Sequence, residues 1–405
     1  MTRILGIKVE FTSTIENFIS HAGPKISYGK KPMGNEFYIY ANGLLTQQGF
    51  ETIDITVKEW EETKCFFSAT ERSAIPFDIF SASFYLLSRY EEYLPHVKDE
   101  FGRYPVTESL GYKASFLHQP VVDIWAYKLK RILVSHFPKL IFKKRNFIVH
   151  HLVSSPQPYK YIQKGIVRSI IGGTGELVRF KLKSLYNRIK VLTLGKDPND
   201  TFSWVITTIK NRPEKFTFFF MLGESIDYNE SITTYRKRFK ALVKFVSDYK
   251  EVGLLFSNDG LEDYQIKKKE KQQLEAVTNR AVKSTMNIQL RVNLPDFYRD
   301  LVELEVEKDF TMVYQNTPGY RAGTCTPFLF YDLDYEIRTP LTIHPIAFTT
   351  ESLKTKHHSQ VENLINEFRS QVLQVQGTFS ILFTNTDFID IPENKSWRLF
   401  FTENS

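Results

Sequence analysis

Cysteine is the scarcest chemistry-bearing residue in this sequence. The 405 residues contain two cysteines, Cys65 and Cys325, which are too few for a disulfide framework or a zinc ribbon. This scarcity excludes the small secreted folds that disulfides hold together. It also favours a reducing compartment, and we expect the protein to be cytoplasmic.

Long apolar runs are missing as well. The first ten residues place a short apolar stretch between Arg3 and Lys8, and they contain no continuous apolar segment of signal-peptide length. No later segment approaches the roughly 20 apolar residues that a membrane-spanning helix needs. The sequence therefore predicts no transmembrane segment.

Clustered charge is also lacking. The net charge of +7 is modest for this length and is dispersed along the chain, so a nucleic acid is not an expected partner. Apolar residues at 42% and charged residues at 24% are typical of globular proteins, and the length fits two compact domains. Aromatic residues reach 15%, which suits both protein cores and sugar-stacking platforms. That enrichment alone does not identify a function.

Residues 1–142 are predicted to form a smaller α/β domain. Strand-like runs occur at residues 37–40 and 53–57, and a helical pattern begins at Ile79 and is stopped by Pro95. A second helical pattern follows Pro120. The basic segment 143–146 then precedes a new apolar run, so we place the domain boundary there.

Strand-like and helix-like patterns alternate from residue 147 to residue 405. Helical periodicity is clearest between Tyr235 and Tyr249 and between Val361 and Val372. Seven mostly apolar strands separated by helices predict a parallel sheet buried on both faces. The simplest arrangement is a closed or nearly closed barrel. The candidate strands are residues 147–151, 216–221, 252–256, 282–289, 311–314, 342–348 and 378–384.

Several motifs carry a resemblance to a known family. The segment 318–328, which runs Pro-Gly-Tyr-Arg-Ala-Gly-Thr-Cys-Thr-Pro-Phe and continues through residues 330–333, resembles the third motif of bacterial polysaccharide deacetylase-like proteins of the NodB type. Residues 77–78, 88–95, 99–100 and 102–103 resemble the domain that precedes the barrel in the same subfamily. The resemblance implies a deformed (β/α)7 barrel behind an extra N-terminal domain. Its further anchors are Tyr159-Lys160, Lys196-Asp197-Pro198, Thr201-Phe202, Gly253 and Gly377-Thr378-Phe379.

The family removes an acetyl group from an N-acetylated sugar with the help of a divalent metal such as zinc. The metal polarises the amide carbonyl and acidifies a bound water, a carboxylate takes the water's proton, and a histidine protonates the leaving amine. Three protein ligands and one open position are what a catalytic zinc requires. In the family, an Asp-x-Asp pair and histidines on later strands supply these groups.

In this chain the corresponding positions have changed. Alignment by the retained anchors places the two aspartates at Leu152 and Ser154, the ligand histidine at Leu255, a further histidine at Asn287 and the acid histidine at Thr384. Residues 147–155 contain no Asp or Glu at all. We therefore expect no catalytic residue and no metal or other cofactor. Arg321, which orients the catalytic aspartate in the family, is expected to have lost its partner. The retained side chains predicted to bind a ligand are Tyr159, Tyr320, Arg321, Thr324 and Asn385.

Other residues allow a second interpretation. His150 and His151, placed at the end of the first barrel strand, could replace a lost ligand, but surface or core-edge histidines are the expectation, as for His344 and the pair at 357–358. Acidic residues follow the third and the last predicted barrel strand and could form a displaced site, although solvated loops are favoured. They are Asp259, Glu262, Asp263, Asp387 and Asp390. Gly172–Gly175 resembles a phosphate-binding loop without its Lys-Ser/Thr continuation. Residues 179–190 alternate basic and apolar side chains, which suits packing on the barrel or an anionic membrane surface. Trp204 and Trp397 are candidates for sugar-stacking platforms, although core positions are the expectation.

These observations lead to three hypotheses of different classes. The first is a deacetylase-like protein of carbohydrate or envelope-polysaccharide metabolism that has lost hydrolysis and binds a glycan or a protein partner. The second is an active carbohydrate N- or O-deacetylase with relocated groups. The third is a structural or interaction protein.

Overall fold

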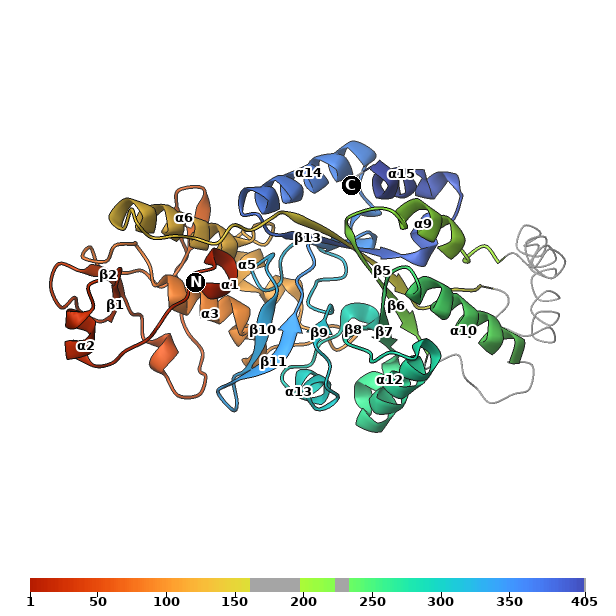
Figure 1. Cartoon of the computed structure of the whole chain (residues 1–405), viewed down its shortest axis with the longest axis horizontal. Helices are drawn as coiled ribbons and strands as arrows, with labels where there is room; N and C mark the ends of the chain where they lie inside the picture. The colour runs from red at the N-terminus through yellow and green to blue at the C-terminus, as the bar shows by residue number, and fades with distance from the viewer. Residues whose placement is uncertain (161–196, 223–232, 404–405) are drawn as a thin grey trace.

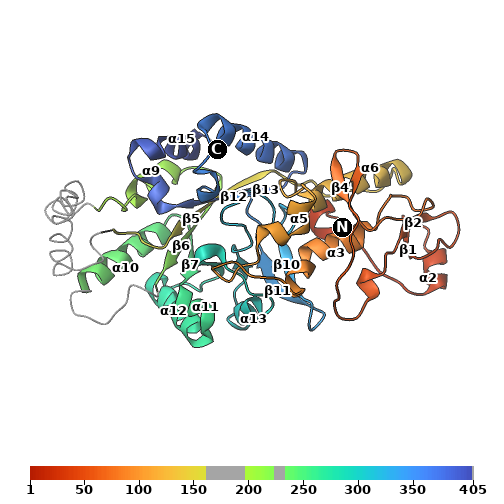
Figure 2. The same cartoon turned by 180° about the vertical axis from the view of Figure 1, so that it is seen from behind.

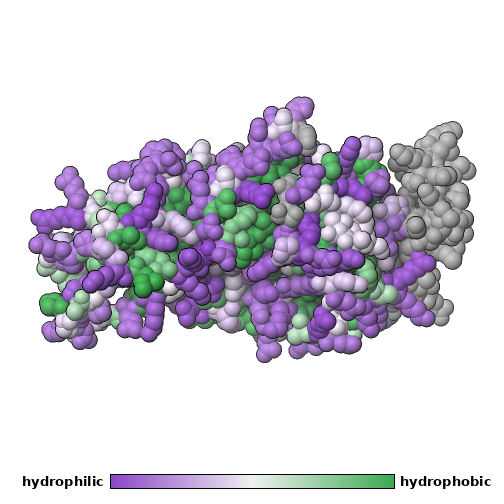
Figure 3. Space-filling model, turned by 45° about the horizontal axis from the view of Figure 1, so that its top comes forward, coloured by the Kyte–Doolittle hydropathy of each residue, from purple (hydrophilic) through white to green (hydrophobic). Residues whose placement is uncertain are grey.

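The computed structural model describes residues 1–160, 197–222 and 233–403. The molecule is elongated, with the N-terminal part at one end and a large sheet flanked by helices in the middle (Figure 1). Among the described helices, none is long and apolar enough to cross a membrane. The face drawn in Figure 3 is largely hydrophilic, with smaller apolar patches between the polar side chains.

The N-terminal part is built from short elements around an aromatic core. Phe66, Phe77 and Trp125 are all buried there, and Trp125 contacts both phenylalanines edge to face, with the Phe77 and Trp125 ring centroids 5.2 Å apart. Strands β1 and β2 are parallel and β3 and β4 antiparallel, whereas the predicted strand at 53–57 is wrong. The elements are α1 (Thr2–Leu5), α2 (Ile15–Ser20), β1 (Ile26–Gly29), β2 (Phe37–Tyr40), η1 (Leu44–Thr46), β3 (Lys58–Trp60), β4 (Thr63–Cys65), α3 (Ile79–Leu87), α4 (Tyr90–Tyr93), η2 (Val106–Glu108), α5 (Leu110–Lys113) and α6 (Val121–His136).

The helix predicted from Ile79 is two helices in the structure. Asp78 begins α3, because its carboxylate accepts hydrogen bonds from the backbone N–H groups of Phe80 and Ser81. Arg89 has a left-handed backbone with φ of 57°, which separates α3 from α4. This break places the side chains of Arg89 and Glu92 toward the second half of the chain.

The second half contains a sheet of nine strands in the order β10-β11-β9-β8-β7-β6-β5-β13-β12. Every neighbouring pair is parallel except β10 and β11. The α/β class is therefore confirmed, with nine strands where the sequence predicted seven. The strands are β5 (Ile148–Ser155), β6 (Lys215–Met221), β7 (Glu251–Phe256), β8 (Ser284–Asn287), β9 (Lys308–Asp309), β10 (Phe328–Asp332), β11 (Ile337–Ile343), β12 (Phe348–Thr349) and β13 (Thr378–Thr384).

Two strand predictions differ from the structure for identifiable reasons. Residues 311–314 form no strand, because the Thr311 N–H and hydroxyl bind the Asp309 carboxylate at 2.9 and 2.8 Å instead of a neighbouring strand. The run at 342–348 is split between β11, which pairs with β9, and β12, which pairs with β13. Gln315 and Gly319 bridge from β9 toward β12, since their backbone groups bond Thr349 and Ala347.

Helices cover the outside of the sheet. In Figure 1, α14, α15 and α9 lie along one side, and α10, α12 and α13 lie along the other. Lys267 of α12 is buried and pairs with Asp300 of α13. The elements are α9 (Phe202–Ile209), α10 (Thr233–Ser247), α11 (Asn258–Glu262), α12 (Tyr264–Thr278), η5 (Ile288–Leu290), α13 (Asp296–Glu303), η6 (Glu351–Leu353), α14 (His358–Gln374), η7 (Asn385–Phe388), η8 (Pro392–Asn394) and α15 (Lys395–Glu403).

Candidate functional site

The inner face of the sheet is filled with apolar side chains. Alternate residues of a strand point to opposite faces, so Val153 and Phe383 join the large core under the helices while Leu152 and Leu382 point the other way. Phe219 and Phe310 fill the centre, with ring centroids 5.3 Å apart. We call this set the inner cluster; its buried members are Leu152, Phe219, Met221, Leu255, Met286, Leu290, Phe310, Val313, Ile346 and Leu382.

The structure brings most of the positions aligned with the family's catalytic groups to this inner face. Leu152 and Leu255 are 0% and 1% exposed and belong to the inner cluster. Ser154 and Thr384 lie opposite each other on the paired strands β5 and β13, near their carboxyl ends, and are partly exposed. Asn287 ends β8, is buried, and donates from Nδ2 to the Arg291 carbonyl at 2.5 Å.

These residues do not fit a divalent metal. Leucine offers no electron pair, and serine and threonine hydroxyls are weak ligands near neutral pH, whereas zinc requires three imidazole, thiolate or carboxylate donors. Within the described ranges, no group of three His, Cys, Asp or Glu side chains comes together that could hold a metal ion. The inner face therefore supports no reaction step through a metal.

Arg321 has a partner, contrary to the expectation from the sequence. Its Nε and Nη2 donate to the two carboxylate oxygens of Glu92 at 2.8 and 2.7 Å, and both side chains are buried. Arg89 also donates to Glu92, at 2.8 Å, and to the Arg321 carbonyl. Burial would raise the pKa of Glu92, but the charges of Arg321 and Arg89 outweigh it and lower the pKa to about 2. The N-terminal domain thus supplies the carboxylate that Arg321 binds.

The rest of the third motif is also held by the N-terminal domain. Asp123 of α6 is fully buried and accepts hydrogen bonds from the Thr324 hydroxyl at 2.6 Å, the Cys325 N–H at 2.9 Å and the Thr326 hydroxyl. Arg145 lies 3.5 Å from the same carboxylate. Thr324, predicted to bind a ligand, therefore uses its hydroxyl in an internal contact with α6 of the N-terminal part.

The other predicted binding residues are buried as well. Asn385 donates to the carbonyls of Gln157 and Asn199 at 3.3 and 3.2 Å, which ties the start of η7 to the segments after β5. Tyr320 is 2% exposed and packs edge to face on Phe368. Tyr159 is 5% exposed, and its hydroxyl lies 3.5 Å from the Arg238 carbonyl. Ligand binding by these residues stays a prediction.

The histidines of β5 lie away from the strand ends, so their predicted position is wrong. His150 and His151 are the third and fourth residues of β5, which continues to Ser155. His150 is buried, its Nε2 lies 2.9 Å from the Thr217 hydroxyl, and its ring contacts Phe310. Burial, and then the nearby His344, lower the pKa of His150 well below its ordinary value. His151 is fully buried and stacks on Phe216, so both rings lie inside the core and not at the surface or the core edge that the sequence predicted.

The acids considered for a displaced site do not converge. Asp387 is buried and accepts from the Thr350 hydroxyl and the Thr384 N–H, Asp263 caps α12, and Asp390 lies in an exposed loop. Asp309, which the sequence did not single out, is fully buried, and burial raises its pKa to about 6. Its carboxylate is surrounded by the hydroxyls of Thr311, Tyr298 and Thr285, so water does not reach it.

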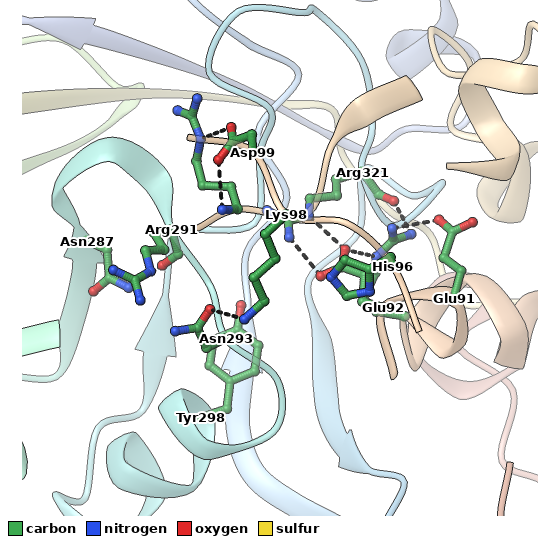
Figure 4. Close-up of polar contacts among 12 residues, drawn as sticks. Glu91, Glu92, His96, Lys98, Asp99, Asn287, Arg291, Asn293, Tyr298 and Arg321 are labelled. Carbon is green, nitrogen blue, oxygen red and sulfur yellow. Dashed lines mark hydrogen bonds and ion pairs between the residues drawn. The ribbon is translucent and has the colours of Figure 1, made fainter. Parts of the chain in front are cut away.

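The sequence did not predict what covers the carboxyl ends of β8 and β9. Residues 96–104, which we call the mouth loop, reach from the N-terminal domain over these strand ends (Figures 2 and 4). Arg103 donates to the Gln289 carbonyl at 3.3 Å and to the Gln315 side chain, and Lys98 donates to the Asn293 side chain at 3.2 Å. The sequence signal in this segment was the Asp99-Glu100 and Gly102-Arg103 pattern. It contributed to the family resemblance but did not indicate where the loop lies.

Three remaining predictions have simple outcomes. Trp204 is half-buried and lies against the Arg398 guanidinium at 4.2 Å, while Trp397 is 8% exposed in the outer core. Both cysteines are buried and free. Gly172–Gly175 and the basic segment 179–190 lie outside the described residues.

Comparisons with known proteins give a limited result. Residues 1–138 match a family of unknown function, DUF7033. No curated protein matches the chain. Among solved structures, a protein assigned as a polysaccharide deacetylase from Mycobacterium smegmatis is similar at 10% identity and a TM-score of 0.40, over 65% of this chain and 86% of that chain. A CE4 family pseudoenzyme from Bacillus anthracis is similar at 11% identity and a TM-score of 0.27, over 60% of this chain and 66% of that chain. Similarities this distant assign neither an activity nor a substrate.

Proposed function

We propose that this chain is a polysaccharide deacetylase-like protein of carbohydrate or envelope-polysaccharide metabolism that has lost metal-dependent hydrolysis. In this proposal it works in the cytoplasm by binding a glycan, alone or with a protein partner. The observation that carries the proposal is the inner cluster, in which Leu152 and Leu255 occupy positions that the family gives to an aspartate and a histidine.

The physical argument concerns the activation of water. A water molecule loses a proton near neutral pH only beside a metal or a well-placed base. The inner face offers hydroxyls at Ser154 and Thr384 and hydrocarbon beneath them. Glu92 is held ionised by two arginines, and Asp309 is enclosed by its hydrogen-bond donors, so neither carboxylate is a free base. This arrangement disfavours the alternative of an active deacetylase with relocated groups.

An assay of acetate release tests the proposal. The purified protein is incubated with tetra-N-acetylchitotetraose and with an O-acetylated xylan, with and without added zinc. We expect no acetate above the buffer blank, while an active NodB-type deacetylase run in parallel releases it. Acetate release that stops on addition of a chelator would contradict the proposal and support the relocated-site alternative.

A further inference from the structure

The turn that follows β8 brings two unusual polar groups together at the mouth of the sheet. Asn287 ends β8 and Arg291 follows η5, and the two side chains lie beside each other in Figure 4. The turn between them is strained, because Gln289 and Leu290 both adopt left-handed φ values, of 59° and 55°. Strain of this kind is retained where the surrounding structure needs a particular side-chain arrangement.

Asn287 and Arg291 are incompletely satisfied inside the protein. Asn287 is 1% exposed, and among the described residues nothing hydrogen-bonds to its Oδ1. The Nε of Arg291 is likewise buried with no partner in the described chain, although its Nη1 pairs with Glu262 at 2.5 Å. A buried polar atom without a partner costs free energy, so most such atoms in folded proteins are bonded. One acceptor and one donor are therefore available at one place.

The mouth loop lies directly against Arg291. A Cβ atom at Gly102 would lie 3.2 Å from Arg291 Nε, so the loop backbone approaches the guanidinium closely. The loop is a compact turn in its own right, because the Asp99 carboxylate accepts from the N–H groups of Phe101 and Arg103 and from Arg103 Nε. It is thus able to move as a unit.

The attachment of the mouth loop is weaker than that of the rest of the domain. Between its ends it reaches the sheet through the polar contacts of Lys98 and Arg103, while its Val97 is 83% exposed and its Phe101 42%. Tyr104, at its C-terminal end, is buried against Leu117 and Tyr314 and anchors that end. By contrast, the Glu92–Arg321 pair is buried, as are the contacts of Asp123. Segments with few buried apolar contacts open at lower free energy than the core. The loop is therefore able to open while the two domains stay joined.

We propose that residues 96–104 form a lid over a carbohydrate-binding site in which Asn287 Oδ1 accepts, and Arg291 Nε donates, a hydrogen bond to neighbouring hydroxyls of one sugar unit. Of two adjacent sugar hydroxyls, one donates to the amide oxygen of Asn287 and the other accepts from the guanidinium N–H of Arg291. This inference rests on the proposed function, because it names how the same protein holds a glycan without cleaving it. The lid must open to admit the sugar, and its backbone then rests on the bound sugar instead of on Arg291. Binding thereby exchanges two unsatisfied groups for two hydrogen bonds.

Hydrogen–deuterium exchange on the full chain tests the lid. The probes are cellotetraose, tetra-N-acetylchitotetraose and its deacetylated form. Loss of acetyl groups from the acetylated probe is followed by mass spectrometry. In the free protein, we expect amides of residues 96–104 to exchange at least tenfold faster than those of residues 88–93. At least one probe should slow exchange in the mouth loop. Equal exchange in both segments, or no protection by any probe, would overturn the proposal.

A substitution tests the site itself. Arg291→Ala should weaken binding of the protecting probe at least tenfold in calorimetric titration, while Arg131→Ala, which removes an exposed arginine, should leave it unchanged. Unaltered binding by Arg291→Ala would overturn the assignment of the site even if the loop opens. If tetra-N-acetylchitotetraose loses an acetyl group, the proposed function fails, and protection of the loop still reports separately on the lid. The exchange measurement needs no variant, so it decides the lid even if Arg291→Ala does not fold.

Discussion

The substitution Leu152→Asp is expected to unfold the protein or to lower its free energy of unfolding by about 5 kcal/mol or more. Leu152 is fully buried, and the residues of the inner cluster offer a carboxylate no hydrogen-bond donor of their own. An aspartate at this position is the residue that a metal-dependent member of the family would carry. Chemical denaturation followed by circular dichroism measures the effect.

Two control variants separate burial from charge. Leu152→Met keeps the volume and should cost less than about 1.5 kcal/mol. Ser154→Asp introduces the same carboxylate two residues later on the same strand, where the side chain is partly exposed, and should cost far less than Leu152→Asp. If Leu152→Asp were as stable as Ser154→Asp, the inner face would be hydrated and the argument against a metal site would fail.

The second large effect is expected at the buried ion pair between the domains. Arg321→Met leaves Glu92 buried with Arg89 alone and should destabilise the protein by about 3 to 5 kcal/mol. The double variant Glu92→Leu with Arg321→Met removes both charges and should cost clearly less than the sum of the single changes. Additive single effects would contradict the assignment of Glu92 as the partner of Arg321.

The same pair predicts how stability depends on pH. The pKa of Glu92 is lowered in the folded protein to about 2, below its ordinary value of about 4.3, so the folded state binds the proton less tightly than the unfolded state. Its contribution is present above about pH 4.3 and is lost as the pH falls toward 2. It amounts to roughly 3 kcal/mol. Glu92→Gln should therefore lose less stability than the unsubstituted protein over this pH range.

Some features could be predicted from the sequence because their causes are local. The strand at residues 378–384 is mostly apolar in its centre and buried on both faces, so the predicted strand matches β13. The lack of acids in residues 147–155 likewise needs no structure to be seen, and the structure adds that Leu152 lies in the inner cluster. Local pattern was enough in both cases.

Other features depend on contacts between distant parts of the chain. Glu92 and Arg321 are separated by 229 positions, and no pattern in either segment points to the other. The same holds for Asp123, which binds residues 324–326, and for the mouth loop over Arg291. Residues 311–314 were predicted as a strand because they are apolar, but the Asp309 carboxylate takes the hydrogen bond that a ladder would need. The expectation that Arg321 lacks a partner was wrong because Glu92 lies in a distant part of the sequence.

The central claim is that the inner face of this sheet cannot hold a catalytic metal, and metal stoichiometry tests it most directly. The purified chain is dialysed to equilibrium against micromolar zinc, and bound zinc is measured by mass spectrometry beside a NodB-type enzyme. The account predicts that bound zinc stays far below one ion per chain, while the enzyme binds one. One zinc ion per chain, removable by chelator and retained in the presence of competing magnesium, would contradict it.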